Sequence, residues 1–125
     1  MRNLIIDAAN EKIFFSIITD SQSYTTTYSN SRENFDKFVI LLKGFLKENG
    51  LNFNEIQNIF VNKGPGKFSS IRISISIAKA ISIANNVDLY GFSSQDVGQN
   101  DYKKTIEMFK KGKLIKGLIK PLYSS

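Results

Sequence analysis

Hydrophobic and β-branched residues open the chain in three short runs that turn-forming residues separate. The runs at residues 2–7 and 13–18 contain apolar residues at successive positions, whereas residues 24–28 consist only of Tyr and Thr. Successive apolar positions indicate burial on both faces of a sheet, and a polar strand suits a sheet edge. The pattern therefore predicts a meander of three strands joined by tight turns, with the third strand at the edge.

A helical period follows the three runs. Ser31, with Glu33 and Asn34 after it, is a typical helix start, and Asn49-Gly50 is a typical stop. Between these signals the apolar residues recur at spacings of three and four positions, as one face of an amphipathic helix requires. The residues on that face are Phe35, Phe38, Val39, Leu42, Phe45 and Leu46. We expect one helix here.

The second half of the chain alternates strand and helix patterns. After a connection at residues 51–57, the apolar run 59–61 predicts a buried strand, and Gly64-Pro65-Gly66 breaks it. A helix is expected from about Phe68 to Asn86, and a strand over residues 87–92. The pattern weakens from Ser93 onward, so we expect a loosely ordered end.

This order of elements predicts a fold class. Strand, strand, strand, helix, strand, helix, strand requires parallel crossovers through both helices, with right-handed connections. We therefore expect an α/β fold made of a single ribonuclease H-like lobe (actin-like ATPase superfamily), with a mixed five-stranded sheet and helices.

Composition narrows the chemistry that the chain can carry. The sequence has no Cys, His or Trp, which excludes disulfides, thiolate nucleophiles, imidazole bases and the usual zinc ligands. Ten Phe, five Tyr and a hydrophobic content of 42% favour one folded domain over disorder. The opening apolar run is too short for a signal peptide or a membrane span, so a cytoplasmic protein without a membrane partner is expected.

Positive charge gathers near the end of the chain. Residues 93–125 hold seven Lys against Asp96, Asp101 and Glu107, whereas the preceding residues are almost balanced. A basic tail can attract phosphate backbones, although a run of Lys is more often a solvated surface. The stretch lacks the mixture of aromatic and basic residues that single-stranded nucleic acid favours, which argues against direct binding of nucleic acid by this tail.

The most informative segment lies between a strand and a helix at residues 62–73. Its glycines permit a tight reversal, and the first amides of the next helix could hold an anion. A P-loop is excluded, because it would need Gly in place of Val61 and Ser or Thr in place of Phe68. Asp7, Lys67 and Ser69 are candidate nucleotide or phosphate contacts, with a solvated Lys and a helix-capping Ser as the alternatives.

Residues 64–74, GPGKFSSIRIS, resemble the signature of the TsaB (YeaZ) family, Gly-Pro-Gly-Ser-Phe-Thr-Gly-Val/Leu-Arg-Ile-Gly. Residues 4–9, 31–34 and 90–94 are similar to further segments of the same family. The sequence departs from the family pattern at Ala8, near Asn34, and at Ser70 and Ser74. The resemblance covers residues 1–95, the expected first lobe. It implies that residues 96–125 are a shortened remnant of the second lobe and C-terminal tail.

The second predicted helix is apolar on two sides. Phe68, Ile71 and Ile75 lie on one side of a helical projection, and residues including Ile73 and Ile77 lie nearly opposite. Either the first helix covers the second side within the same chain, or a partner does. Small residues every fourth position, at 70, 74 and 78, would let another helix approach closely.

The resemblance favours the partner. It implies a non-catalytic scaffold that pairs through both helices with TsaD, the ATP-dependent catalytic subunit of tRNA threonylcarbamoyladenosine synthesis, or with a second copy of itself. TsaE is a further expected partner, tRNA is expected to be contacted only indirectly, and no cofactor is expected. The predicted interface residues are Arg32, Phe35, Ser70, Ser74, Ile77, Ala78 and Ile81.

Asp7 ends the first strand, where ribonuclease H-like enzymes place a metal-binding carboxylate. Such an enzyme needs several convergent carboxylates, and Glu33, Asp36 and Asp88 are the other candidates. We expect instead that Asp7 caps a turn by accepting backbone N–H groups near Ala9 and Asn10. A metal-dependent nucleic-acid enzyme and a self-associating structural remnant stay as alternative functions.

Overall fold

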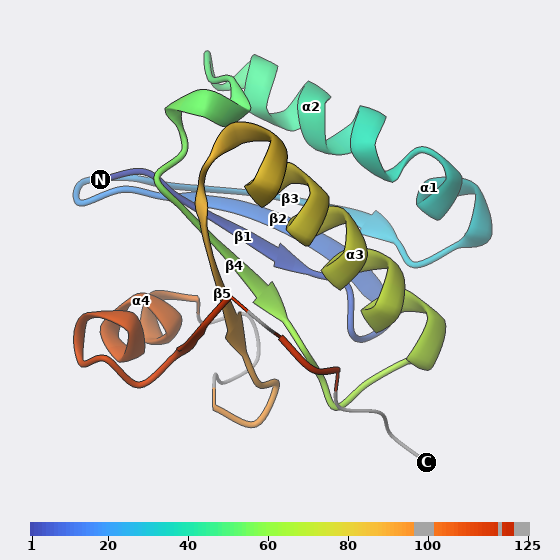
Figure 1. Ribbon diagram of the computed structural model, residues 1–125. Coiled ribbons are helices and arrows are strands. Elements are labelled where there is room, and N and C mark those ends of the chain that lie inside the picture. Colours follow the sequence, from blue (N-terminus) through green and yellow to red (C-terminus); the bar gives the residue numbers. More distant parts are fainter. Residues whose placement is uncertain (97–101, 118, 122–125) are drawn as a thin grey trace.

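The computed structural model describes residues 1–96, 102–117 and 119–121 as one mixed sheet with helices on both faces (Figure 1). The strands lie in the order β3-β2-β1-β4-β5-β6. They are β1 (Asn3–Asp7), β2 (Lys12–Ile18), β3 (Ser23–Ser29), β4 (Asn58–Asn62), β5 (Asp88–Phe92) and β6 (Ile115–Lys116). The helices are α1 (Arg32–Asp36), α2 (Phe38–Glu48), α3 (Phe68–Asn85) and α4 (Lys103–Lys110), with a short 3-10 helix η1 (Phe53–Glu55).

The strand pairing confirms the predicted topology. β1 and β2 pair antiparallel, as do β2 and β3, and β3 is at the edge. β4 lies parallel to β1, and β5 parallel to β4, so α3 and the helical segment before β4 are the connections of parallel crossovers. Beyond the five predicted strands, the two-residue β6 pairs antiparallel with β5.

The first predicted helix is in fact two. Ser31 caps α1 as expected, because its side chain accepts a hydrogen bond from the Asn34 amide at 3.2 Å. The helix then stops at Lys37, whose N–H bonds the carbonyl of Asn34 in a tighter turn. This turn redirects the chain so that Phe38 begins α2 facing the core.

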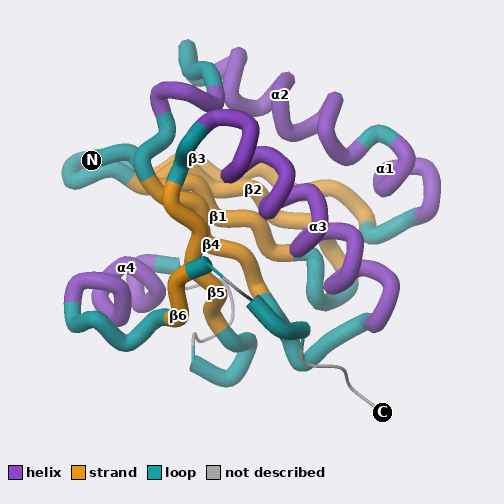
Figure 2. The backbone as a smooth tube through the Cα atoms, in the orientation of Figure 1, coloured by secondary structure: helices purple, strands orange, loops and turns teal. Residues whose placement is uncertain are grey.

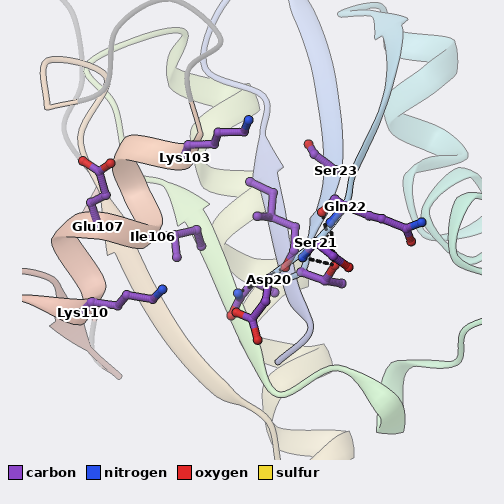
Figure 3. Close-up of a pocket in the computed structure, with 11 residues that line it drawn as sticks. Asp20, Ser21, Gln22, Ser23, Lys103, Ile106, Glu107 and Lys110 are labelled. Carbon is purple, nitrogen blue, oxygen red and sulfur yellow. Dashed lines mark hydrogen bonds between the residues drawn. The ribbon is translucent and has the colours of Figure 1, made fainter.

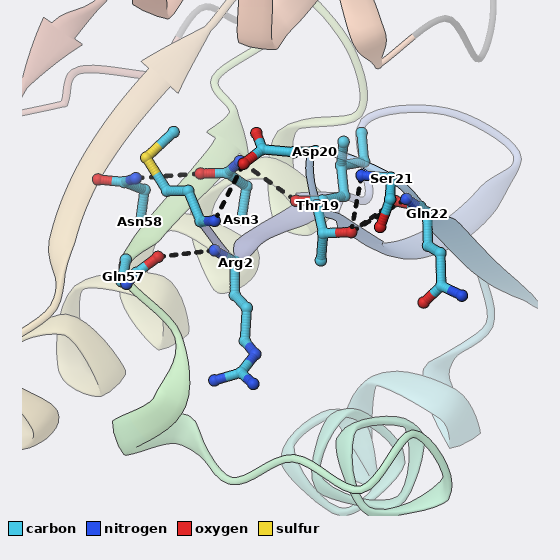
Figure 4. Close-up of polar contacts among 10 residues, drawn as sticks. Arg2, Asn3, Thr19, Asp20, Ser21, Gln22, Gln57 and Asn58 are labelled. Carbon is cyan, nitrogen blue, oxygen red and sulfur yellow. Dashed lines mark hydrogen bonds and ion pairs between the residues drawn. The ribbon is translucent and has the colours of Figure 1, made fainter.

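The two faces of the sheet carry different layers (Figure 2). Alternate strand residues such as Leu4 and Ile6 pack under α2 and α3, whereas Ile5 and Phe60 pack under α4. Both faces are therefore buried, as the successive apolar positions of β1 and β2 predicted. At the amino ends of β1 and β4, the buried Asn58 side chain donates to Asn3 at 3.0 Å (Figure 4).

The described residues after Ser93 include a regular helix, α4, where a loosely ordered end was predicted. Residues 97–101, 118 and 122–125 of that predicted end lie outside the described residues. The aromatic ring of Phe109 on α4 makes edge-to-face contacts with Phe60 and Tyr90 of the sheet. Tertiary packing of aromatic rings therefore orders this helix, whose local sequence is a weak guide. In the described part of the chain, no helix is long and apolar enough to cross a membrane.

Candidate functional site

Polar side chains meet where β1, β4 and β5 end. The Asn62 amide donates to the Asp7 carboxylate and to the Ser94 hydroxyl, at 2.9 Å in each case. Because the carboxyl ends of parallel strands share one edge of a sheet, residues far apart in sequence converge there. Tyr102, just before α4, completes the group by donating its hydroxyl to Asp7 at 2.7 Å. We call Asp7, Asn62, Ser94 and Tyr102 the polar lock.

Burial raises the pKa of the Tyr102 hydroxyl far above its ordinary value, and the neighbouring Asp7 carboxylate raises it further. The hydroxyl therefore stays protonated and remains a hydrogen-bond donor. Sequence reasoning missed Tyr102. Its only local signal is an aromatic residue beside a Lys-rich helix, and its partner lies 95 positions earlier in the chain.

The polar lock also fixes the loop before α3. The Gly64 amide donates to the Asn62 side chain at 2.8 Å, and the Ser94 hydroxyl donates to the carbonyl of Pro65 at 3.2 Å. Gly66 lies so close to the turn after β1 that an added Cβ would overlap the Ala9 carbonyl oxygen. Only glycine fits there, and this close contact sets the position at which α3 begins.

The structure encloses Asp7. Its carboxylate accepts hydrogen bonds from the Ala9 amide at 3.3 Å, as the turn-capping hypothesis predicts, and from Asn62 and Tyr102. Among the described residues, Ala9 is the backbone donor to Asp7 and no bond from the Asn10 amide to that carboxylate is present, whereas the Asn10 carbonyl accepts a bond from Asn30. With only 8% of its surface exposed, Asp7 is not presented to a soluble nucleotide or phosphate.

The other two candidate phosphate contacts lie on the surface. Lys67 is paired with Glu11 at 3.4 Å, and its backbone amide bonds the Ala9 carbonyl. Ser69 is exposed in the first turn of α3. The helix-capping alternative for Ser69 is wrong, since the N-cap position is Lys67, whose side chain makes no capping hydrogen bond.

Four of the predicted interface residues belong to the interior of the chain. Ser70, Ser74, Ala78 and Ile81 are all buried, so their placement on an outer face is corrected. The Ser70 hydroxyl donates to Asn30, and the small side chains allow α3 to approach the sheet rather than another helix. The structure thus favours internal packing for this side of the helix.

The remaining predicted residues are at least partly accessible. Arg32 is exposed, Ile77 is half-buried, and Phe35 is half-buried and stacks on Phe38. On α3, a shallow depression of about 360 Å³ is lined by Phe68, Ser69, Arg72, Ile73, Ser76 and Ile77, which we call the α3 strip. The surface of the strip is mainly apolar, because the side chains of Phe68 and Ile73 contribute much of it, being 50% and 38% exposed.

Arg72 shapes one end of the α3 strip. Its guanidinium carbon lies 5.4 Å from the centre of the Phe68 ring, a distance typical of a cation–π contact. The contact places a positive charge beside an exposed aromatic ring. Arginine and aromatic residues in this arrangement are characteristic of protein interfaces.

The Lys-rich helix α4 borders a second depression, of about 480 Å³, opposite the β2–β3 turn (Figure 3). Lys103 and Lys110 lie along it, with Ile106 between them. Across residues 1–96, 102–117 and 119–121, no group of three acidic side chains could hold a metal ion. The described carboxylates therefore do not form the cluster that the nuclease hypothesis requires.

Comparison with known proteins places these features in a family context. A family model described as TsaD, tRNA N6-adenosine threonylcarbamoyltransferase, matches residues 21–98. The tRNA threonylcarbamoyladenosine biosynthesis protein TsaB of Buchnera aphidicola subsp. Schizaphis graminum is 26% identical over 94 residues, 75% of this chain and 45% of that protein. TsaB of subsp. Baizongia pistaciae is 29% identical over 85 residues, 67% of this chain and 38% of that protein.

The chain thus spans less than half the length of the two TsaB relatives. Among solved structures, YeaZ from Pseudomonas aeruginosa matches with a TM-score of 0.72 at 18% identity, covering 83% of this chain and 49% of that one. RuvC from T. thermophilus, in complex with a Holliday junction substrate, gives a TM-score of 0.60 at 7% identity, covering 94% and 99%. At these identities the likeness shows the fold alone, and it confirms the predicted ribonuclease H-like lobe.

Proposed function

Because the chain belongs to the TsaB (YeaZ) family, we propose that it is a non-catalytic scaffold in the threonylcarbamoyladenosine modification of tRNA. In this proposal it binds TsaD and holds that subunit in a competent form. TsaE is a further partner of the same assembly, and tRNA is contacted only through the assembly. These roles are proposed for a chain whose match covers less than half the length of each of the two TsaB relatives.

The observation that carries the proposal is the α3 strip. It replaces the buried serines and alanine as the candidate contact surface, because Phe68 and Ile73 of the strip are exposed to solvent and Ile77 is only half-buried. The polar lock and the close contact of Gly66 with Ala9 hold the start of α3 in place. A preorganised surface loses little conformational entropy when it binds, which supports a docking role.

The enclosed carboxylate supports a role without catalysis. A catalytic group has to reach substrate or a metal ion, whereas both carboxylate oxygens of Asp7 are bonded to donors of the same chain. The hydrogen bonds of Asp7 instead serve to join β1 to β4 and to the segment that begins α4. A structural use of the residue accounts for its burial and its partners.

The proposal is tested by co-expression with TsaD of the same organism, followed by affinity capture and size exclusion. We expect wild type to form a complex and Ile73→Glu to weaken it by tenfold or more, because a charge is placed in the centre of the α3 strip. Ile83→Glu is the matched control, since Ile83 is 83% exposed on the same helix and lies outside the strip.

Two outcomes would contradict the proposal. Failure of wild type to capture TsaD would remove the scaffold role, and equal weakening by both glutamate variants would remove the α3 strip as the contact surface. A substitution at Ser74 is unsuitable for this test, because Ser74 is fully buried and a larger side chain there would disturb the fold.

A further inference from the structure

The edge strand β3 is open in a way that the opposite edge is not. β6 ends the sheet with two residues, one of them Lys116, whereas β3 pairs with β2 over seven consecutive residues without a bulge. β3 contains no charged residue and no Pro. Proteins usually protect long sheet edges with Lys, Pro or bulges, since an open edge is a template for another strand.

The pattern of hydrogen bonds between β2 and β3 shows which backbone groups of β3 face outward, away from β2. Thr19 donates to the Gln22 carbonyl at one end of the β2–β3 hairpin, and Asn30 donates to the Glu11 carbonyl at the other. Figure 4 shows the Thr19 end, where the threonine hydroxyl also accepts a bond from the Gln22 amide. In an antiparallel ladder, hydrogen-bonded and non-hydrogen-bonded pairs alternate. Because Gln22 and Asn30 both belong to hydrogen-bonded pairs, the backbone groups of Tyr24, Thr26 and Tyr28 also bond to β2. The outward groups belong to Ser23, Thr25, Thr27 and Ser29.

Most of these outward groups are free to bond another strand. Within the part of the chain that the structure describes, no backbone bond from outside the β2–β3 ladder reaches Thr25 or Thr27. At the end of the strand the Ser29 carbonyl is already used, because it accepts from the Ser31 amide and the Asn34 side chain. The open region is therefore centred on Thr26.

The sequence of the strand reads the same in both directions. Residues 23–29 are Ser-Tyr-Thr-Thr-Thr-Tyr-Ser, with Thr26 at the centre. If two copies pair antiparallel about a two-fold axis at Thr26, each residue faces its own kind in the other copy. The same register places outward-facing Thr25 of one copy opposite outward-facing Thr27 of the other. The N–H and C=O groups of these two residues then face each other and can exchange both backbone hydrogen bonds.

The side chains suit this pairing on both faces of the sheet. Like pairs of Thr and of Tyr stabilise antiparallel strands, and Thr and Tyr both favour strands. Because β3 has no charge, the pairing brings no like charges directly opposite each other within the strand. Tyr24 is 41% exposed and would face Tyr28 of the second copy, which gives the pair apolar surface to bury.

We propose that β3 pairs with β3 of a second copy of this chain about a two-fold axis at Thr26, which joins two sheets into one. About six backbone hydrogen bonds would cross the axis, two for each Thr25–Thr27 pair and one for each end pair. This surface is separate from the α3 strip, because α3 packs over β1, β4 and β5. It also differs from the predicted homodimer through the helices, and it does not depend on the proposed function.

Charge substitution at the axis is the first test, because Thr26 is the one strand position that would face itself. Sedimentation equilibrium of the full chain should show a dimer, and Thr26→Lys or Thr26→Glu alone should raise its Kd by tenfold or more. An equimolar mixture of the two variants should restore the dimer, since opposite charges then meet at the axis. Circular dichroism checks that each variant is folded.

Cysteine substitution gives a second test that does not rely on charged variants. The chain has no cysteine of its own, so a single thiol reports its own neighbours. Thr26→Cys should form a disulfide dimer under mild oxidation, because directly opposed non-bonded residues have Cα atoms about 4.5 Å apart. Thr25→Cys is the matched control, because it would face Thr27 and its thiols would not meet.

Several results would overturn the proposal. These are a wild-type chain that stays monomeric at all concentrations, a dimer that persists in both charge variants, and equal cross-linking of the two cysteine variants. Capture of TsaD is measured separately and is expected to survive substitution at Thr26, so failure of this inference and failure of the proposed function give different results.

Discussion

The two faces of the sheet are held by different kinds of contact. Under α2 and α3 the buried residues form one wide apolar cluster, in which Phe15 contacts the rings of Phe38 and Phe45. Under α4 the apolar cluster is smaller, and the hydrogen bond from Tyr102 to Asp7 adds to it. The first face depends on the amount of apolar surface that it buries, whereas the second depends also on the geometry of a few polar groups.

The largest effect should come from removing a ring on the wide face. Phe15 is fully buried, so Phe15→Ala should lower the free energy of unfolding by about 3–5 kcal/mol through lost burial and a residual cavity. Urea denaturation of wild type and variant measures the difference. A loss below about 1 kcal/mol would mean that the face does not depend on close packing of this ring.

A smaller effect is expected from the polar lock. Asp7→Ala leaves the donors of Asn62 and Tyr102 without their acceptor, which should cost about 2–3 kcal/mol. Asp88→Ala is the matched control, because Asp88 forms an exposed ion pair with Lys116 at 3.3 Å and should cost less than about 1 kcal/mol. If both variants lose the same stability, the polar lock has no special role in the fold.

The smallest effect should be that of Tyr102→Phe, which keeps the ring and removes one hydrogen bond, at a cost of about 1–2 kcal/mol near neutral pH. The raised pKa of Tyr102 adds a dependence on pH. Its stabilising contribution is complete below pH of about 10, the ordinary tyrosine pKa, and declines as the pH rises toward the raised value.

The pH profile separates this hydrogen bond from general packing. Above pH of about 10, the unfolding free energy of wild type should fall more steeply than that of Tyr102→Phe. Tyr24→Phe serves as the control, because Tyr24 is exposed and its hydroxyl donates to the exposed Gln22 side chain rather than to a buried carboxylate. Parallel profiles for wild type and Tyr102→Phe would contradict the assignment of Tyr102 as a buried donor.

The sequence predicted the structure best where the local pattern of apolar and polar residues determines the element. The paired strands and the edge position of β3 follow from apolar runs and from the Tyr and Thr content of residues 24–28. The cap at Ser31 and the turn at Asp7 were also predictable, since both are local side-chain-to-backbone bonds. Local chemistry within a few residues leaves a readable signal.

Features that depend on the third dimension were missed. Ser70 and Ser74 gave the same signal for contact with a partner helix as for close approach to the sheet, and only the fold decides between them. The bond from Tyr102 to Asp7 joins residues 95 positions apart, so no local pattern contains it. The break between α1 and α2 at Lys37 was also missed, because the helical spacing of apolar residues continues across it and only one backbone turn departs from the helix.

The late position of Tyr102 has a consequence for how the chain is made. A ribosome releases β1 long before α4, so the nascent chain can assemble the wide apolar face while its other face still lacks a cover. Until Tyr102 emerges, Phe60, Phe92 and the Asp7 carboxylate have no helix over them. Synthesis itself therefore sets an order of events, in which one half of the core can close early and the other half closes only after Tyr102 and α4 have been made.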